Sequence, residues 1–354
     1  MRLIDTYIAK TIISGTLMVL LVLGALLAFV DFVAEMDDVG KGQYSILQAS
    51  GFVMLSLPKR LYELFPTAVL IGSLLSLGAL AGNSELTVMR ASGVSIMRIV
   101  FSVLKAGFVL LLCVALIGEF VLPFSERQAQ ELRAKNLNQT ISLAGESGFW
   151  ARDGQRFIYV SHVFPSMKLG KIKIYELATD NKLKRITHAK SAQYINGQWH
   201  INNLLQTEFG LSQIESRTME SEVWQNLINP DLFRVVSLEP ANMSAMDLYK
   251  YSDYLQANNL DASHYELAFW IKIFTPISSL VMLLIALPFV FGSQRSSGAG
   301  NRMLVGLLLG IGFFLLNRMV NHLGQVYHVA PFVSASAPII LATLASFYAL
   351  KKVR

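Results

Sequence analysis

Cysteine is almost absent from this chain of 354 residues. The single one, Cys113, lies within an apolar run, so no disulfide can form within the chain. A domain outside the membrane therefore cannot depend on disulfide bridges and must be stable through its own core.

Charge is also scarce. Charged residues make up 15% of the chain, hydrophobic residues make up 53%, and the mean hydropathy is +0.46. Soluble domains carry about 25% charged residues, so this composition predicts a membrane protein with several spans. The net charge of +6 arises outside residues 125–266, where acidic and basic residues nearly balance. Basic residues near the ends of apolar runs suit cytoplasmic helix ends, and we expect no nucleic-acid partner.

Catalytic motifs are missing from the sequence. It contains no G-x-x-x-x-G-K-[ST] phosphate loop, no H-E-x-x-H zinc motif and no G-x-S-x-G nucleophile motif. The six histidines are scattered without the spacing of metal ligands. We therefore expect a chain that is not an enzyme and that holds neither a cofactor nor a metal.

A polar segment, Ser125 to Glu266, separates two apolar blocks. A helix needs about 20 apolar residues to cross the hydrocarbon core of a bilayer. The two blocks contain six such runs, namely Thr11–Val30, Leu64–Ser84, Ile99–Leu122, Ile273–Phe291, Met303–Val320 and Pro331–Leu350. We expect three membrane helices in residues 1–124, a water-exposed domain in residues 125–265 and three more membrane helices in residues 266–354.

The distribution of basic residues predicts the orientation. Most of those near span ends fall on one side, which we expect to be cytoplasmic: Arg2, Lys10, Arg90, Arg98, Arg295, Arg302, Lys351, Lys352 and Arg354. Both termini then lie in the cytoplasm, and the central domain lies on the other side of the membrane.

The central segment has the pattern of an all-β domain, either a sandwich or a jelly roll. Asp153-Gly154 and Asn196-Gly197 are typical hairpin turns between alternating stretches. A two-residue turn at Asn196-Gly197 places Tyr194 opposite Trp199. If the domain forms a groove, Tyr159, Tyr194 and Trp199 are candidate lining residues, although the pattern does not decide which face is inside.

Residues 83–98, NSELTVMRASGVSIMR, predict a short helix between the second and third spans. Asn83 or Ser84 is a suitable N-cap, Glu85 lies in the first turn and Gly93 is a suitable stop. Two interpretations remain open: a plain interfacial turn, or a coupling helix that fits into a cleft of a cytoplasmic ATPase.

Several charges fall at membrane depth, where they are costly and usually face a bundle interior, a partner or water. For Lys105 and Glu119 we favour simple snorkelling to the interface. A second group lies toward the outer ends of the spans and could receive an anionic amphiphile. Its candidate cations are Lys41, Lys59, Arg60, Arg133 and Arg318.

Over nearly its whole length the chain resembles the YjgP/YjgQ permease family of the lipopolysaccharide export system. The stretches that carry the resemblance are IDTYIAKTI, NSELTVMRASGVS, GFWARDGQRFIYV and ELAFWIKIFTPISSLVMLLIALPFVFG. WARDGQRFIYV and PISSLVMLLIALPF are more similar to the LptG branch than to LptF, the nearest alternative.

The resemblance implies the permease subunit of an ABC exporter in the bacterial inner membrane, with a periplasmic β-jellyroll. It implies pairing with a homologous LptF permease, two copies of the ATPase LptB and the bitopic periplasmic protein LptC, with lipopolysaccharide as cargo. Glu85 falls on the coupling glutamate of the family, with Leu86, Met89 and Arg90 beside it. Arg133 falls on a basic position that contacts the lipid head group. Asp31 departs from the pattern, because a lysine is expected there.

Two other functions compete with transport. A membrane-anchored periplasmic scaffold or sensor needs only one or two spans rather than six. A lipid-modifying membrane enzyme needs a nucleophile, metal set or carboxylate pair, and the sequence pattern contains none that we recognise.

Overall fold

The computed structural model describes residues 3–137, 149–164, 168–178, 182–195, 197–210, 214–224, 239–291 and 299–353. The chain divides into two compact units. The first comprises Met1–Asp37, Ala49–Ala129 and Ser263–Arg354, and the second comprises Asp38–Gln48 and Gln130–Ala262.

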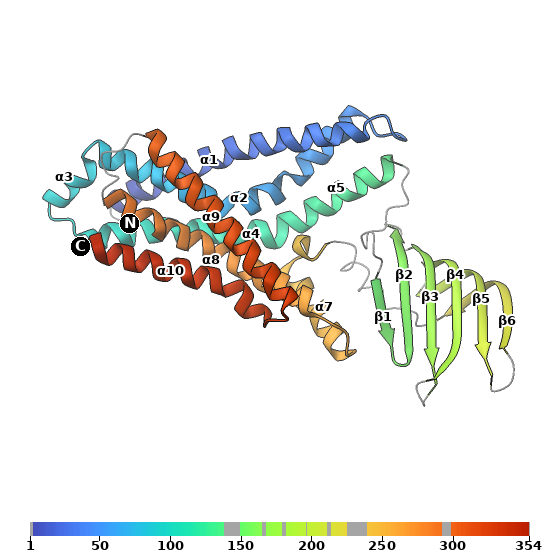
Figure 1. The fold of residues 1–354 in the computed structure, drawn as a ribbon. Helices are drawn as coiled ribbons and strands as arrows, with labels where there is room; N and C mark the ends of the chain where they lie inside the picture. Colours follow the sequence, from blue (N-terminus) through green and yellow to red (C-terminus); the bar gives the residue numbers. More distant parts are fainter. Residues whose placement is uncertain are drawn as a thin grey trace. The chain divides into compact units, whose positions relative to one another are not determined.

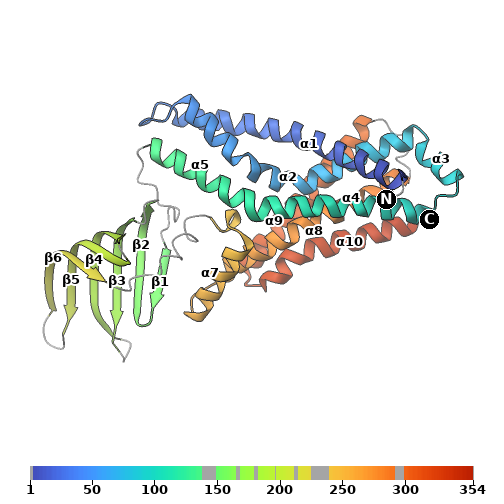
Figure 2. The same cartoon turned by 180° about the vertical axis from the view of Figure 1, so that it is seen from behind.

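The first unit is a bundle of long helices (Figures 1 and 2). They are α1 (Leu3–Glu35), α2 (Ile46–Gly82), α4 (Ile96–Leu116), α8 (Ser263–Phe291), α9 (Ala299–Val326) and α10 (Pro331–Val353). A short helix, α3 (Glu85–Ala91), connects α2 to α4. Within the described residues, six helical segments are long and apolar enough to cross a membrane, which confirms the six predicted spans.

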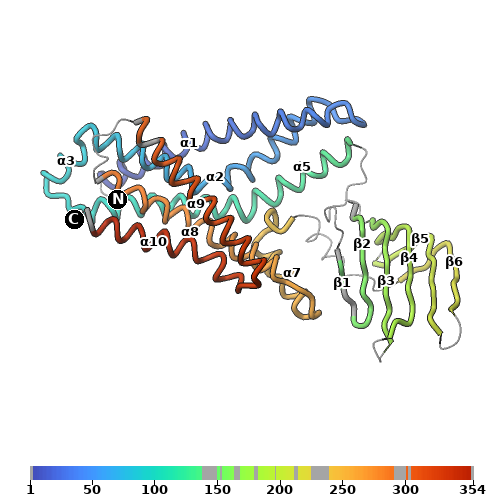
Figure 3. The backbone as a smooth tube through the Cα atoms, in the orientation of Figure 1, coloured from blue at the N-terminus to red at the C-terminus, as the bar shows by residue number. Residues whose placement is uncertain are grey.

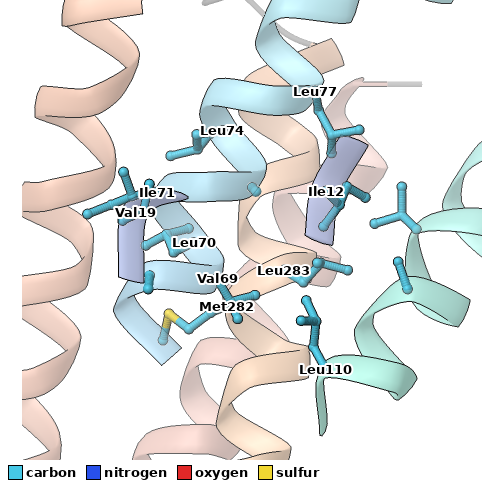
Figure 4. Close-up of a cluster of buried hydrophobic side chains, with 14 of the residues drawn as sticks. Ile12, Val19, Val69, Leu70, Ile71, Leu74, Leu77, Leu110, Met282 and Leu283 are labelled. Atoms are coloured by element: carbon cyan, nitrogen blue, oxygen red, sulfur yellow. The ribbon is translucent and has the colours of Figure 1, made fainter. Parts of the chain in front are cut away.

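Helix α2 forms the centre of the bundle. In its most apolar window 72% of the residues are buried, against 11% in α1 and 17% in α9. Figure 4 shows Val69, Leu70 and Leu74 of α2 among side chains of other helices, including Ile12 of α1 and Leu283 of α8. Helix α2 is therefore the most buried of these helices.

Helices α1 and α2 pack with their backbones in direct contact. A Cβ atom added at Gly72 would lie only 2.6 Å from the Cα of Thr16. Ser76 donates a hydrogen bond from its hydroxyl to the carbonyl oxygen of Thr11, at 3.0 Å. Small residues at helix contacts are typical of membrane bundles, and here they fix which face of α1 meets α2.

The third span extends beyond its apolar run. Helix α4 continues through a π-helical turn (Ile117–Val121) into α5 (Leu122–Asn136). The helix outlasts the apolar residues because SERQAQELRAKN contains many good helix formers. The predicted boundary at residue 125 therefore falls inside a helix. The central part of the second unit begins at Gln130.

The second unit contains one six-stranded antiparallel sheet in the order β1-β2-β3-β4-β5-β6, the meander drawn in Figure 3. The strands are β1 (Phe149–Asp153), β2 (Arg156–Phe164), β3 (Lys168–Leu177), β4 (Leu183–Ile195), β5 (Gln198–Phe209) and β6 (Ile214–Trp224). Helix α7 (Ala245–Ala257) follows the sheet and leads to α8. The sheet bears out the prediction of a β domain inserted between two membrane blocks.

Both predicted hairpins are present, one of them shifted by a residue. Ile195 pairs with Gln198, so the connection has two residues, and Tyr194 pairs with Trp199 as expected. In the first hairpin Asp153 pairs with Arg156. The turn is therefore Gly154-Gln155 rather than Asp153-Gly154, with the positive φ of 57° at Gly154. Glycine at the first of two turn positions is typical of a type II′ turn.

Candidate functional site

Helix α3 lies at the end of the bundle where both termini lie (Figures 1 and 2). Ser84 occupies the N-cap position, but its φ is 62° and its side chain makes no capping hydrogen bond. The predicted side-chain cap is therefore wrong, because the left-handed backbone of Ser84 does not adopt the extended conformation that capping requires.

Glu85 is held by a residue of another helix. The hydroxyl of Tyr7 in α1 donates a hydrogen bond to Oε2 of Glu85, at 2.7 Å. Tyr7 is 46% exposed and Glu85 is half-buried. The contact joins IDTYIAKTI to NSELTVMRASGVS, two of the stretches that the sequence singled out.

Helix α3 ends as expected at Gly93. The amide of Gly93 donates to the carbonyl of Arg90, and the amide of Val94 donates to the carbonyl of Met89, each at 3.0 Å. This pair of bonds is a Schellman motif, which requires the left-handed φ of 86° found at Gly93. The short helix therefore has a defined end.

The two faces of α3 have different surroundings. Leu86 is buried and Met89 packs against the core of the bundle. Thr87, Val88 and Arg90 are exposed, Val88 to 63%. Of the residues predicted for coupling, Leu86 and Met89 thus stabilise the bundle itself, whereas Arg90 is on the accessible face. Val88 is an exposed apolar residue that the sequence pattern did not single out. A helical wheel places it about 200° around the axis from Arg90, so the two residues lie at opposite edges of the exposed face.

A second cluster lies near the opposite end of α1. Nε and Nη2 of Arg60 in α2 bind Oδ2 and Oδ1 of Asp31 in α1, at 2.7 and 2.9 Å. Glu63 lies 3.4 Å from Nη1 of the same guanidinium. Lys59 lies 3.9 Å from a carboxylate oxygen of Glu126, which is buried. Two of the candidate cations are therefore already paired with carboxylates.

In the second unit Arg133 and Lys41 share one carboxylate. Nη2 of Arg133 lies 2.5 Å from Oδ2 of Asp38, and Nζ of Lys41 lies 2.6 Å from its Oδ1. The segment is also fixed by the amide of Gln43, which donates to the carbonyl of Asn136 at 2.7 Å.

Arg318 differs from the other candidate cations. It lies in α9, its side chain is exposed, and it has no ion-pair partner among the residues that the structure describes. It is therefore available to an external anion.

The sequence missed two buried polar contacts within the bundle. Lys272 of α8 is buried, with Nζ 6.0 Å from the ring centre of Tyr62, whose hydroxyl donates to the Lys272 carbonyl at 3.3 Å. Lys272 directly precedes the predicted run Ile273–Phe291, whereas α8 begins nine residues before Lys272. Asp5, also buried, binds Lys105 at 2.8 Å, so Lys105 is paired rather than simply snorkelling.

The sheet separates the three aromatic residues proposed for a groove. Tyr194 and Trp199 pair with ring centres 5.1 Å apart, and Trp199 is fully buried. Tyr159 lies between two buried residues of β2, so it points to the opposite face. There it contacts Trp150 at 5.1 Å between ring centres, and Trp150 also stacks on Tyr175.

The face that carries Trp199 is apolar and closely packed. Its buried members come from five strands: Ala151, Ile158, Val160, Leu169, Ile172, Ile174, Ala189, Ala192, Trp199, Ile201 and Leu204. Across the described part of the chain, no group of histidine, cysteine and acidic residues could hold a metal ion.

Known proteins match this chain over nearly its full length. The family described as lipopolysaccharide export system permease LptF/LptG matches residues 6–352. The chain is 35% identical to the lipopolysaccharide export system permease protein LptG of Haemophilus influenzae over 353 residues, covering 99% of both chains. It is also 35% identical to the LptG protein of Escherichia coli K12 over 352 residues, covering 99% of this chain and 98% of that protein.

Proposed function

The chain belongs to the LptF/LptG family of lipopolysaccharide export permeases, and we propose how its described surfaces serve that export. It is a permease subunit of a lipopolysaccharide export system and a multi-pass protein of the inner membrane. The family match over residues 6–352, together with six membrane helices and an inserted sheet, carries this conclusion. No observation favours a scaffold or sensor without transport activity.

We propose that the end of the bundle with α3 and both termini faces the cytoplasm and that the sheet lies in the periplasm. The basic residues near this end support the orientation by the positive-inside rule. ATP hydrolysis then belongs to a partner, since the sequence has no phosphate loop. We infer a complex with a homologous LptF permease, two copies of the ATPase LptB and the bitopic protein LptC.

We propose that the ATPase contacts the exposed face of α3. Val88 supplies an apolar side chain at one edge of this face, and Arg90 supplies a charge at the other edge. Glu85 lies at the start of the same helix, half-buried, with its carboxylate oriented by Tyr7. Leu86 and Met89 support the contact from inside, by anchoring α3 to the bundle.

We propose that the paired cations bind lipid phosphates by exchange of partners. A phosphate carries more charge than a carboxylate and accepts the same two-point contact from arginine. Asp31 and Asp38 would hold Arg60 and Arg133 in position until a phosphate replaces them. Lys41 and Lys59 would act as further cations of these clusters, whereas Arg318 would bind without exchange.

We propose that the lipid chains follow the apolar face of the sheet, which carries Tyr194 and Trp199. Tyr159 lies on the other face and would not line this path. Apolar packing on one face of a sheet is what acyl chains require, whereas the exposed face with Lys173 and His188 suits water.

The test of this function is reconstitution. The chain should co-purify with an LptB-type ATPase and an LptF-type permease, and lipopolysaccharide should stimulate ATP hydrolysis by the complex in proteoliposomes. Release of lipopolysaccharide from those vesicles should require ATP. A complex that hydrolyses ATP at the same rate with and without lipopolysaccharide, and releases none, would refute the assignment.

A further inference from the structure

The first two turns of α1 hold two other helices at the end of the bundle where α3 lies (Figure 1). Asp5 accepts hydrogen bonds from the hydroxyl of Ser102 at 2.6 Å and from Nζ of Lys105 at 2.8 Å, both in α4. Tyr7 donates its hydroxyl to Glu85 of α3 at 2.7 Å. One short stretch of α1 therefore contacts both helices that flank the loop at residues 92–95.

The two contacts lie on different sides of α1. Residues two apart on an α-helix are separated by about 200° around its axis. Asp5 is only 6% exposed, so its ion pair is an internal anchor, while Tyr7 is 46% exposed and its hydroxyl reaches outward to α3. The Asp5 contact thus fixes α1 to α4. The Tyr7 contact connects α1 to α3, so a movement of α3 acts on α1 through Tyr7.

Helix α1 is suited to carry a displacement along its length. It has 33 residues with no proline inside, whereas α2 contains Pro58 and Pro66. A helix of that length extends about 50 Å. Near its other end, Asp31 binds Arg60. The same helix therefore connects α3 to the ion pair at which we propose that lipid phosphate binds.

We propose that Tyr7 is a positioning residue for coupling. Its hydroxyl orients the carboxylate of Glu85 toward the ATPase and links the displacement of α3 to α1. This inference rests on the proposed function of α3, and it assigns to Tyr7 a part in transport that neither the family match nor the sequence pattern indicates.

The test uses the complete complex in proteoliposomes, with two quantities measured: the rate of ATP hydrolysis and the lipopolysaccharide released per ATP. Tyr7→Phe removes only the hydroxyl, and we expect release per ATP to fall about tenfold or more, as for loss of one hydrogen bond to a charged group. Tyr348→Phe is the matched control, because Tyr348 is 74% exposed near the C-terminal end of α10, and it should behave as the unmodified protein.

Variants of Glu85 separate the link to Tyr7 from the contact with the ATPase. Glu85→Asp keeps the charge but withdraws the carboxylate, so it should lose as much release per ATP as Tyr7→Phe. Glu85→Gln keeps an acceptor for Tyr7 but removes the charge. Glu85→Ala removes both, and adding Tyr7→Phe to Glu85→Ala should cause no further loss.

The outcomes distinguish this inference from the function on which it rests. If Tyr7→Phe and Glu85→Asp both release lipopolysaccharide at the normal ratio while Glu85→Ala does not, Tyr7 has no positioning role and α3 still couples. Additive losses in the double variant would also overturn the link. If Glu85→Ala itself transports normally, the coupling role of Glu85 is refuted.

Discussion

Arg60 and Asp31 form a two-point ion pair between α2 and α1, with N–O distances of 2.7 and 2.9 Å. Both side chains are partly exposed, Arg60 to 37% and Asp31 to 22%. Asp31, where the resemblance led us to expect a lysine, is thus the partner of the cation that we propose for the lipid phosphate. On that proposal Asp31 competes with the lipid phosphate for the guanidinium of Arg60.

Substitutions at this pair should change lipopolysaccharide affinity in opposite directions. Arg60→Ala removes a phosphate contact of about 1.5–3 kcal/mol but also ends an ion pair of up to about 1 kcal/mol, so affinity should fall about tenfold. Asp31→Asn removes the competitor and should raise affinity by up to about fivefold. Equilibrium binding of labelled lipopolysaccharide to the purified complex measures both.

Glu63 offers a matched control for Asp31. It lies 3.4 Å from the same guanidinium but is 44% exposed and makes one contact rather than two. Glu63→Gln should change affinity less than twofold. Weaker binding in Asp31→Asn, or unchanged binding in Arg60→Ala, would contradict the exchange of partners.

The Arg133, Asp38 and Lys41 cluster gives an independent prediction in the second unit. Arg133→Glu should lower lipopolysaccharide affinity by about one to two decades, because it replaces a phosphate contact with repulsion. Lys41→Ala should have a smaller effect, since the Lys41 side chain is 59% exposed and solvent screens it. The amount of assembled complex, measured by size-exclusion chromatography, is the control for folding. Equal affinities for the two variants would show that Arg133 has no special role.

The membrane helices could be predicted because the length of an apolar run determines whether it can span a bilayer. The polar contacts between helices could not be predicted. Six long apolar runs, two of them with charges inside, indicated six spans, and all six are present. The pairing of Asp31 with Arg60 depends on how α1 is rotated against α2, which the close contact of Gly72 with Thr16 determines. Hydropathy contains no information on that rotation. The sequence could therefore single out Asp31 and Arg60 as unusual charges, but it could not predict that they form an ion pair.

In the sheet, the face on which a side chain lies depends on the backbone conformation as well as on the alternation of the sequence. Strict alternation carried from one strand to the next puts Tyr159 and Tyr194 on one face. The alternation of buried side chains breaks at Lys171 of β3 and Asn203 of β5, which have positive φ values of 49° and 53°. Both lie beside Ala189–Ser191 of β4, and the pairing register is the same on either side of them. Buried positions on β5 therefore change from Trp199 and Ile201 to Leu204, which shifts the alternation by one residue. No hairpin signal in the sequence indicates such a shift.

The two faces of α3 should respond differently to the same substitution. Val88→Asp places a charge on the exposed face, so the permease should insert at normal yield but lose association with the ATPase. Leu86→Asp buries an unpaired charge at a position that is 4% exposed, so the folded yield itself should fall. Yield in the membrane fraction and ATPase co-purification measure the two effects. Normal ATPase binding by Val88→Asp would exclude this face as the contact.

Cysteine labelling tests the orientation. With Cys113 replaced, a cysteine at Ser92, which is exposed after α3, should be protected from an impermeant thiol reagent in intact cells. A cysteine at Asn259, between α7 and α8, should react. After permeabilisation both should react, which controls for accessibility. Labelling of Ser92→Cys from outside would reverse the orientation given by the positive-inside rule.

The apolar path along the sheet can be tested by photocrosslinking at two tyrosines. A photoreactive residue in place of Tyr194 lies on the face with Trp199 and should capture lipopolysaccharide when ATP is hydrolysed. The same residue in place of Tyr159 lies on the opposite face and is the matched control, which should capture little. The expected contrast is about tenfold or more, because apolar burial of the lipid chains, at about 25 cal/mol for each Å² removed from water, favours one face only. Equal capture at both positions, or capture at Tyr159 alone, would show that the lipid does not follow the apolar face.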